Sequence, residues 1–246
     1  MYVVMGVDIK KKQDGNDLEF NIIKGTRNVE MHRRKRKYYK TIPGVIILRE
    51  KEAPGAHPPS RLDTDMSHDH GYIEIPKTVE HKGLYYTVTQ LEASLMKQGV
   101  DVYGIKIPGT VETIPSEAFL NCWRLEYAKL EEGIKMIDYF AFGGCYTLRE
   151  VVFPDSLKYL GQWSFVMCEN LTSITLGRGL RNMVSTFQLC PNIRTIISKA
   201  ETPPSMAEHT FDKEIFENAV VHVPAEFIPN YRDDYYWKDF KTIVAI

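Results

Sequence analysis

The chain has 246 residues and a formal net charge of −1 at pH 7, which excludes a strong overall attraction to nucleic acid or acidic membranes. A hydrophobic content of 43%, with 11% aromatic residues, excludes a disordered chain and allows a substantial core. No run of about 18 consecutive apolar residues occurs, so the sequence predicts no transmembrane helix.

Residues 1–70 differ in pattern from the rest of the chain. The alternation of Leu18, Phe20 and Ile22 and the runs at 26–31 and 45–48 predict short strands joined by glycine-containing turns. A repeat array, which the later sequence indicates, exposes its apolar interior at the first unit and needs a cap. We therefore expect residues 1–70 to be a β-rich N-terminal capping region.

Five consecutive basic residues lie within this region: Arg33, Arg34, Lys35, Arg36 and Lys37. Such a run can contact phosphates or another polyanion, and the tyrosines that follow it could stack on bases or sugars. A basic hairpin is also an ordinary solvated sheet edge. The neutral charge of the whole chain favours the solvated edge, and polyanion contact is the alternative.

A second polar segment, residues 61–71, is dense in side chains of the metal-ligand type. It contains Asp63, Asp65, His68, Asp69 and His70, and His57 lies close by. A metal site would require these side chains to converge. The preceding segment APGAHPPS has the composition of a loop, so we predict a polar surface loop without a metal or other cofactor.

The four cysteines, Cys122, Cys145, Cys168 and Cys190, follow one another at intervals of 23, 23 and 22 residues. Disulfide frameworks and zinc sites usually have uneven or closely paired spacings. One thiol at a fixed long interval indicates a column of an internal repeat. We therefore predict four buried, reduced thiols with a structural role.

The repeat extends beyond the cysteines, and each unit contains a strand pattern, two further apolar positions, an Ala-Phe-like pair and the cysteine. Four copies begin at Val102, Leu125, Leu148 and Leu171. A weaker copy precedes them, with Leu84, Val88, Leu91, Leu95, Met96 and then Gly99 in place of cysteine. Ile193 and Ile196 open a last incomplete unit, in which Ser198 replaces the third apolar residue.

This spacing is typical of a leucine-rich repeat, in which a short strand sends alternate side chains inward and the later apolar residues line the opposite wall. The sequence thus predicts a β-rich α/β fold: a solenoid of about five coils of 22–23 residues over 71–200, with parallel strands. Residues 201–246 are expected to form a C-terminal α+β cap. Its predicted strand is Val220–Val223, and its bulky side chains are Tyr231, Tyr235, Tyr236, Trp237 and Phe240.

The segments IPGTVETIPSEAFLNCWRLE and FPDSLKYLGQWSFVMCENLTSITL resemble the BspA-type leucine-rich repeats of bacterial surface proteins. The resemblance covers residues 71–246, because GYIEIPKTVEHKGLYYTVTQL is similar to the entry segment of that family and the last 46 residues are similar to its closing segment. It implies an exported bacterial protein that binds proteins, cells or glycans.

Alternation along the strand pattern places one set of side chains on the outer face of the predicted sheet. Solenoids bind partners on such extended faces, although a face of mixed polarity is equally compatible with plain solvated surface. The candidate binding residues are Lys106, Tyr127, Lys129, Glu150, Val152, Ser173, Thr175, Thr195 and Ile197.

The sequence contains none of the common nucleophile, phosphate-loop, dinucleotide or zinc-protease motifs, so we do not expect an enzyme. We expect a noncatalytic binding or adhesion module for a protein or glycan. The alternative is an intracellular scaffold or regulatory protein whose basic run contacts nucleic acid or another polyanion. The resemblance implies the cell surface or secretion, whereas the N-terminal residues lack the order of a signal peptide and favour the cytoplasm.

Overall fold

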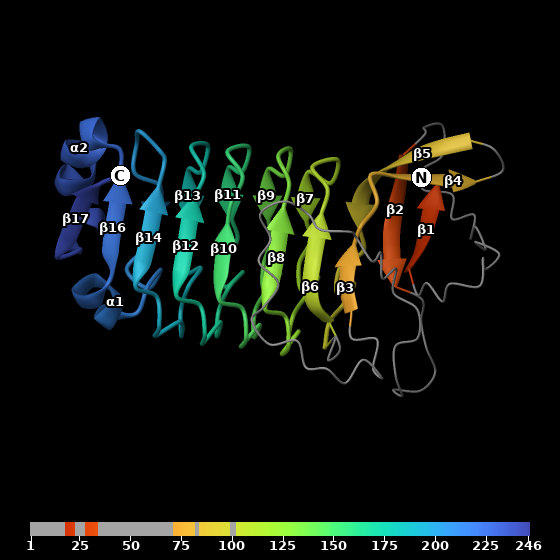
Figure 1. The fold of residues 1–246 in the computed structure, drawn as a ribbon, viewed down its shortest axis with the longest axis horizontal. Helices are drawn as coiled ribbons and strands as arrows, with labels where there is room; N and C mark the ends of the chain where they lie inside the picture. Colours follow the sequence, from red (N-terminus) through yellow and green to blue (C-terminus); the bar gives the residue numbers. More distant parts are fainter. Residues whose placement is uncertain (1–17, 23–27, 34–70, 82–83, 99–101) are drawn as a thin grey trace.

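The computed structural model describes residues 18–22, 28–33, 71–81, 84–98 and 102–246 (Figure 1). Within this part of the chain, successive coils stack side by side, each contributing one strand to a long sheet and most contributing a shorter strand to a second sheet. The apolar side chains between the two sheets form one continuous core.

The long sheet has eight strands, and every neighbouring pair is parallel. From the N-terminal end of the array, its strands are β3 (Gly71–Glu74), β6 (Val102–Ile107), β8 (Tyr127–Leu130), β10 (Glu150–Val152), β12 (Ser173–Leu176), β14 (Thr195–Ser198), β16 (Val220–Val223) and β17 (Thr242–Ala245). Alternate residues point into the core, as the period of two predicts.

The opposite wall is a parallel sheet of five two-residue strands. They are β7 (Thr113–Ile114), β9 (Met136–Ile137), β11 (Tyr159–Leu160), β13 (Asn182–Met183) and β15 (Ser205–Met206). The second residue of each strand is buried, and in β7, β9, β11 and β13 it is an apolar position that the repeat pattern assigned to this wall. The predicted β-rich solenoid with parallel strands is confirmed.

The N-terminal part of the array differs from the prediction in one respect. The weak copy placed Leu84 among the apolar residues of the first coil, but β5 (Leu84–Leu91) pairs with β2 (Asn28–Arg33) and β4 (Thr78–His81). With β1 (Leu18–Ile22) these strands form a separate four-stranded sheet. The place beside β6 belongs to β3, because Ile73 and Ile75 supply the buried alternation there.

The remaining residues of the weak copy lie where the repeat pattern places them. Val88, Leu91, Leu95 and Met96 are all buried in the core of the array. The segment of 45–48 lies outside the described residues, and the division of the chain at residues 70 and 200 stays a prediction.

At one corner of each coil, the chain turns through two residues with a left-handed backbone. One column contains Ser94, Glu117, Phe140, Trp163 and Ser185, and the other contains Gln98, Asn121, Gly144, Met167 and Leu189, all with φ between 51° and 69°. Hydrogen bonds between coils offset this strain. For example, the N–H groups of Glu117, Phe119 and Asn121 donate to the carbonyls of Tyr139, Ala141 and Gly143 at 2.7–2.9 Å.

Inside this corner, the phenylalanines of successive coils stack on one another. Ring centroids are 5.0 Å apart between Phe119 and Phe142, 5.0 Å between Phe142 and Phe165, and 5.7 Å between Phe165 and Phe187. Phe211 continues the stack at 5.4 Å from Phe187. Residues beyond 200 therefore continue the repeat geometry.

The C-terminal segment closes the array with α1 (Lys213–Asn218) before β16, and with η1 (Ala225–Phe227), α2 (Ile228–Asp233) and η2 (Trp237–Asp239) between β16 and β17. Tyr231, Trp237 and Phe240 are buried as expected, whereas Tyr235 is 71% exposed and does not cover the core. The Tyr231 hydroxyl lies 2.6 Å from the Ser198 hydroxyl and donates to the Ala200 carbonyl. Ser198 is therefore polar because it meets the capping tyrosine.

Candidate binding surface

The outer face of the eight-stranded sheet carries two rows of side chains that run across the strands. Strand register places Gly104 opposite Tyr127, Glu150 opposite Ser173, and Ser173 opposite Thr195 in one row. The other row aligns Lys106 with Lys129, Lys129 with Val152, Val152 with Thr175, and Thr175 with Ile197. All nine candidate residues therefore lie on one surface, which we call the strand face.

None of the nine side chains is buried, although their neighbours along the strands are. Lys129, Glu150 and Val152 are exposed, with 52% of Val152 accessible, and the other six are half-buried. The structure also adds residues that the sequence pattern missed. Val220 and Thr242 extend the first row, and His222 and Val244 extend the second.

Charge is concentrated at the N-terminal end of the strand face. The Lys106 ammonium lies 2.5 Å from Glu74 and 3.7 Å from Glu131, while the Lys77 ammonium lies 2.9 Å from Glu131. Partial burial disfavours ionisation of Glu131, but the hydrogen bond and charge of Lys77 outweigh it and lower the pKa of that carboxyl. These ion pairs connect β3, β6 and the residues that follow β3 and β8.

Two tyrosines flank a glycine beside this ionic cluster. The Tyr72 and Tyr127 ring centroids are 6.4 Å apart, and the backbone of Gly104 lies between the two side chains. A Cβ at Gly104 would lie 2.7 Å from a Tyr72 ring carbon, so a larger residue there would require the Tyr72 ring to shift. Burial raises the pKa of the Tyr127 hydroxyl, with Glu150 adding to the effect.

The cysteine column is buried, as predicted, and each thiol has a defined partner. Cys122 donates to the Met96 carbonyl at 3.2 Å, and Cys145 and Cys168 donate to the Phe119 and Phe142 carbonyls at 3.4 Å. Cys190 donates to the Phe165 carbonyl at 3.1 Å. The thiol thus satisfies a carbonyl of the preceding coil, a role that the spacing alone did not reveal.

The remaining sequence candidates lie mostly outside the described residues. Arg33 is the last residue of β2, and the other four residues of the basic run are not described. The same holds for His57 and for Asp63, Asp65, His68, Asp69 and His70. Within the residues that the structure does describe, no group of three or more His, Cys, Asp or Glu side chains could hold a metal ion.

Among solved structures, the chain is similar to a leucine rich cell surface protein from Faecalibacterium prausnitzii A2-165, with a TM-score of 0.55 and 19% identity over 85% of this chain and 53% of that one. It is also similar to the pneumococcal vaccine antigen PcpA, with a TM-score of 0.54 and 15% identity over 88% of this chain and 50% of that one. At such identities, the similarity shows the fold alone. The chain spans about half the length of these two proteins.

The comparison with curated proteins gave no match. No helix in the described part of the chain is long and apolar enough to cross a membrane. The BspA type leucine rich repeat region matches residues 89–219 in six copies, where the spacing in the sequence indicated about five coils. Since this match covers more than half of the 246 residues, the chain belongs to the BspA-type leucine-rich-repeat family.

Proposed function

We propose that the chain is a noncatalytic protein-binding module and that its partner docks on the strand face. The observation that carries this proposal is the composition of the last four strands. There the two outward rows hold Ser173, Thr175, Thr195, Ile197, Val220, His222, Thr242 and Val244, without a Lys, Arg, Asp or Glu.

Depletion of charge at the centre of a patch distinguishes protein interfaces from ordinary surface. The side chains here are short and mostly β-branched, so they lose little rotamer freedom when a partner covers them. The strands beneath them are hydrogen-bonded on both sides, apart from β17 at the edge. A partner would therefore meet strands that are held in place by their neighbours.

A glycan is the second candidate ligand, because the Tyr72 and Tyr127 rings lie together at the other end of the strand face. Aromatic side chains present large, rigid apolar area with a polar tip, which suits a sugar ring. The cell surface or the extracellular space is the proposed location. It is supported by the family and by the surface proteins whose fold is similar.

The test uses a protein array and a glycan array, each probed with labelled wild-type chain and with the variant Thr175→Glu/Thr195→Glu. Two carboxylates at the centre of a covered patch would be desolvated without partners, so we expect binding to a protein spot to weaken by about tenfold or more. The control variant Gln162→Glu/Asn170→Glu adds the same charge at exposed positions away from the strand face and should bind like wild type.

Binding confined to glycan spots and lost in Tyr127→Ala would support the glycan instead. Equal binding by the strand-face and control variants would contradict docking on the strand face. Retention on heparin or DNA that disappears when residues 33–37 are neutralised would favour the alternative of a polyanion-binding scaffold.

A further inference from the structure

The turns that follow the strands of the long sheet are tied together by carboxylates, and this arrangement ends at Arg178. The Glu132 carboxylate accepts the N–H groups of Asp155 at 2.7 Å and of Ser156 at 3.0 Å. The Asp155 carboxylate accepts the N–H of Arg178 at 3.0 Å. Arg178 stands in the same position of the next coil, where its guanidinium cannot accept a hydrogen bond. The following turn is therefore not tied to it in this way.

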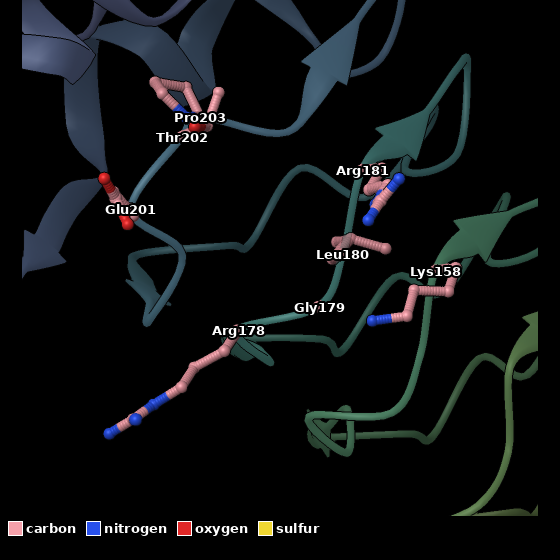
Figure 2. A pocket seen from close by; sticks show the side chains of 8 residues that line it. All are labelled: Lys158, Arg178, Gly179, Leu180, Arg181, Glu201, Thr202 and Pro203. Atoms are coloured by element: carbon pink, nitrogen blue, oxygen red, sulfur yellow. The ribbon is translucent and has the colours of Figure 1, made fainter.

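Where these hydrogen bonds between turns end, a cleft of about 450 Å³ opens between the turn of 177–181 and the turn of 201–203 (Figure 2). Its lining residues are Lys158, Arg178, Gly179, Leu180, Arg181, Glu201, Thr202 and Pro203. Three of these side chains are cationic and one is anionic. The cleft thus carries a positive charge in a chain that is nearly neutral overall.

Lys158 and Arg181 belong to a column that crosses successive coils. The N–H of Lys135 donates to the Glu112 carbonyl at 2.7 Å, that of Lys158 to the Lys135 carbonyl at 2.8 Å, and that of Arg181 to the Lys158 carbonyl at 2.9 Å. The Glu112 carboxylate lies 2.6 Å from the Lys135 ammonium. Among the described residues, no carboxylate lies within 4.0 Å of the side-chain nitrogens of Lys158 or Arg181.

Adjacent strands are about 4.8 Å apart, and like charges placed directly opposite on them destabilise a sheet. Figure 2 shows Lys158 and Arg181 on one side of the cleft and Glu201 on the other. The Arg178 side chain is 78% exposed, and its guanidinium lies 3.8 Å from the Asp155 carboxylate, with which it forms an ion pair. In Figure 2 it points away from Lys158 and Arg181. Lys158 and Arg181 line a space that Glu201 alone does not neutralise.

We propose that this cleft is a binding site for an oxyanion group, sulfate or phosphate, held by Lys158 and Arg181. The guanidinium supplies paired donors in the geometry that such oxygens accept, and the ammonium supplies a compact charge. The group is either a free ion or an ester carried on a glycan. The cleft lies at the turns, away from the strand face. Oxyanion binding in the cleft therefore does not depend on whether a protein docks on the strand face.

The test follows amide chemical shifts of the 15N-labelled chain during titration with sodium sulfate, sodium phosphate or a heparin-derived tetrasaccharide at constant ionic strength. We expect saturable shifts at Gly179, Leu180, Arg181 and Thr202. The variant Lys158→Gln/Arg181→Gln should bind about tenfold more weakly or not at all. Glu201→Gln should bind about threefold more tightly, because it removes the one carboxylate of the lining.

Arg124→Gln/Arg149→Gln is the matched control, since it removes two exposed cations elsewhere and should bind like wild type. Thermal unfolding of each variant checks that the fold is intact. Binding of the tetrasaccharide about tenfold tighter than sulfate identifies a glycan ester as the source, and equal binding identifies the free ion. Shifts that are scattered over the surface, or that persist unchanged in Lys158→Gln/Arg181→Gln, overturn the proposal.

Discussion

The stacked phenylalanines allow a quantitative test of how stability is distributed along the array. Phe142 and Phe165 are both fully buried, and their rings are 5.0 Å apart with an interplanar angle of 13°. Such ring pairs contribute about 0.5–1.5 kcal/mol beyond the area they bury. Phe119 and Phe165, in contrast, are two coils apart, and the ring of Phe142 lies between them.

The perturbation is replacement by leucine, which keeps the position apolar and of similar volume. Each single variant is expected to lower the free energy of unfolding by about 1–3 kcal/mol, because leucine fills the space imperfectly. A double-mutant cycle for Phe142→Leu and Phe165→Leu should give a coupling energy of about 1 kcal/mol. The cycle for Phe119→Leu and Phe165→Leu should give a value near zero, since nearest neighbours carry the interaction in a repeat array.

The assay is urea unfolding followed by far-ultraviolet circular dichroism at one temperature and pH. The slope of the free energy against urea concentration must be equal in all variants for the cycle to be valid. Equal coupling energies for the neighbouring and the distant pair would refute the reasoning, because they would show that strain or relaxation spreads over several coils.

Three further predictions concern single positions. Gly144 has φ +69°, and a Cβ there would lie 2.2 Å from the Asn121 side-chain oxygen; Gly144→Ala should therefore cost about 1–2 kcal/mol in urea unfolding. The Ser164 hydroxyl is buried without a hydrogen-bond partner among the described residues, so Ser164→Ala should stabilise the fold by about 1 kcal/mol. Ser156→Ala should destabilise the fold, because the Ser156 hydroxyl donates to the Ile134 carbonyl and accepts from the Gly133 N–H. Burial raises the pKa of the Cys145 and Cys190 thiols well above 9.0. Their contribution to stability is thus complete below the unfolded pKa near 9 and declines as pH rises further, so the melting temperature should fall from about pH 9 upward, and less steeply in Cys145→Ala. Rapid reaction of all four thiols with a thiol reagent in the native protein would contradict their burial.

Much of the solenoid was predictable because each coil repeats the same pattern of buried apolar residues. The cysteine interval gave the period, and the alternation around Ile105, Ala128, Val151 and Ile174 identified the inward and outward faces correctly. The nine strand-face residues followed from that alternation. The binding role assigned to them remains a proposal.

The sequence pattern was insufficient where a residue pairs with or contacts a residue outside its own coil. The segment from Leu84 matched the repeat, yet Gly71–Glu74 occupies the strand position beside β6. Ser198 looked like a defect, but it meets Tyr231 from 33 residues downstream. Periodicity records burial along one segment and contains no information on which segment pairs with which.

The sequence by itself determined the repeat, its core and the direction of each strand side chain, because alternation of apolar residues is imposed by the burial of every coil. Only the tertiary structure decided how the coils are joined at their corners. The left-handed columns, the carbonyl partners of the four cysteines and the cationic cleft all depend on hydrogen bonds and charges between coils. The contribution of a donor, an acceptor or a charge to stability depends on the partner that it contacts. In this array, that partner lies about one coil away in the chain.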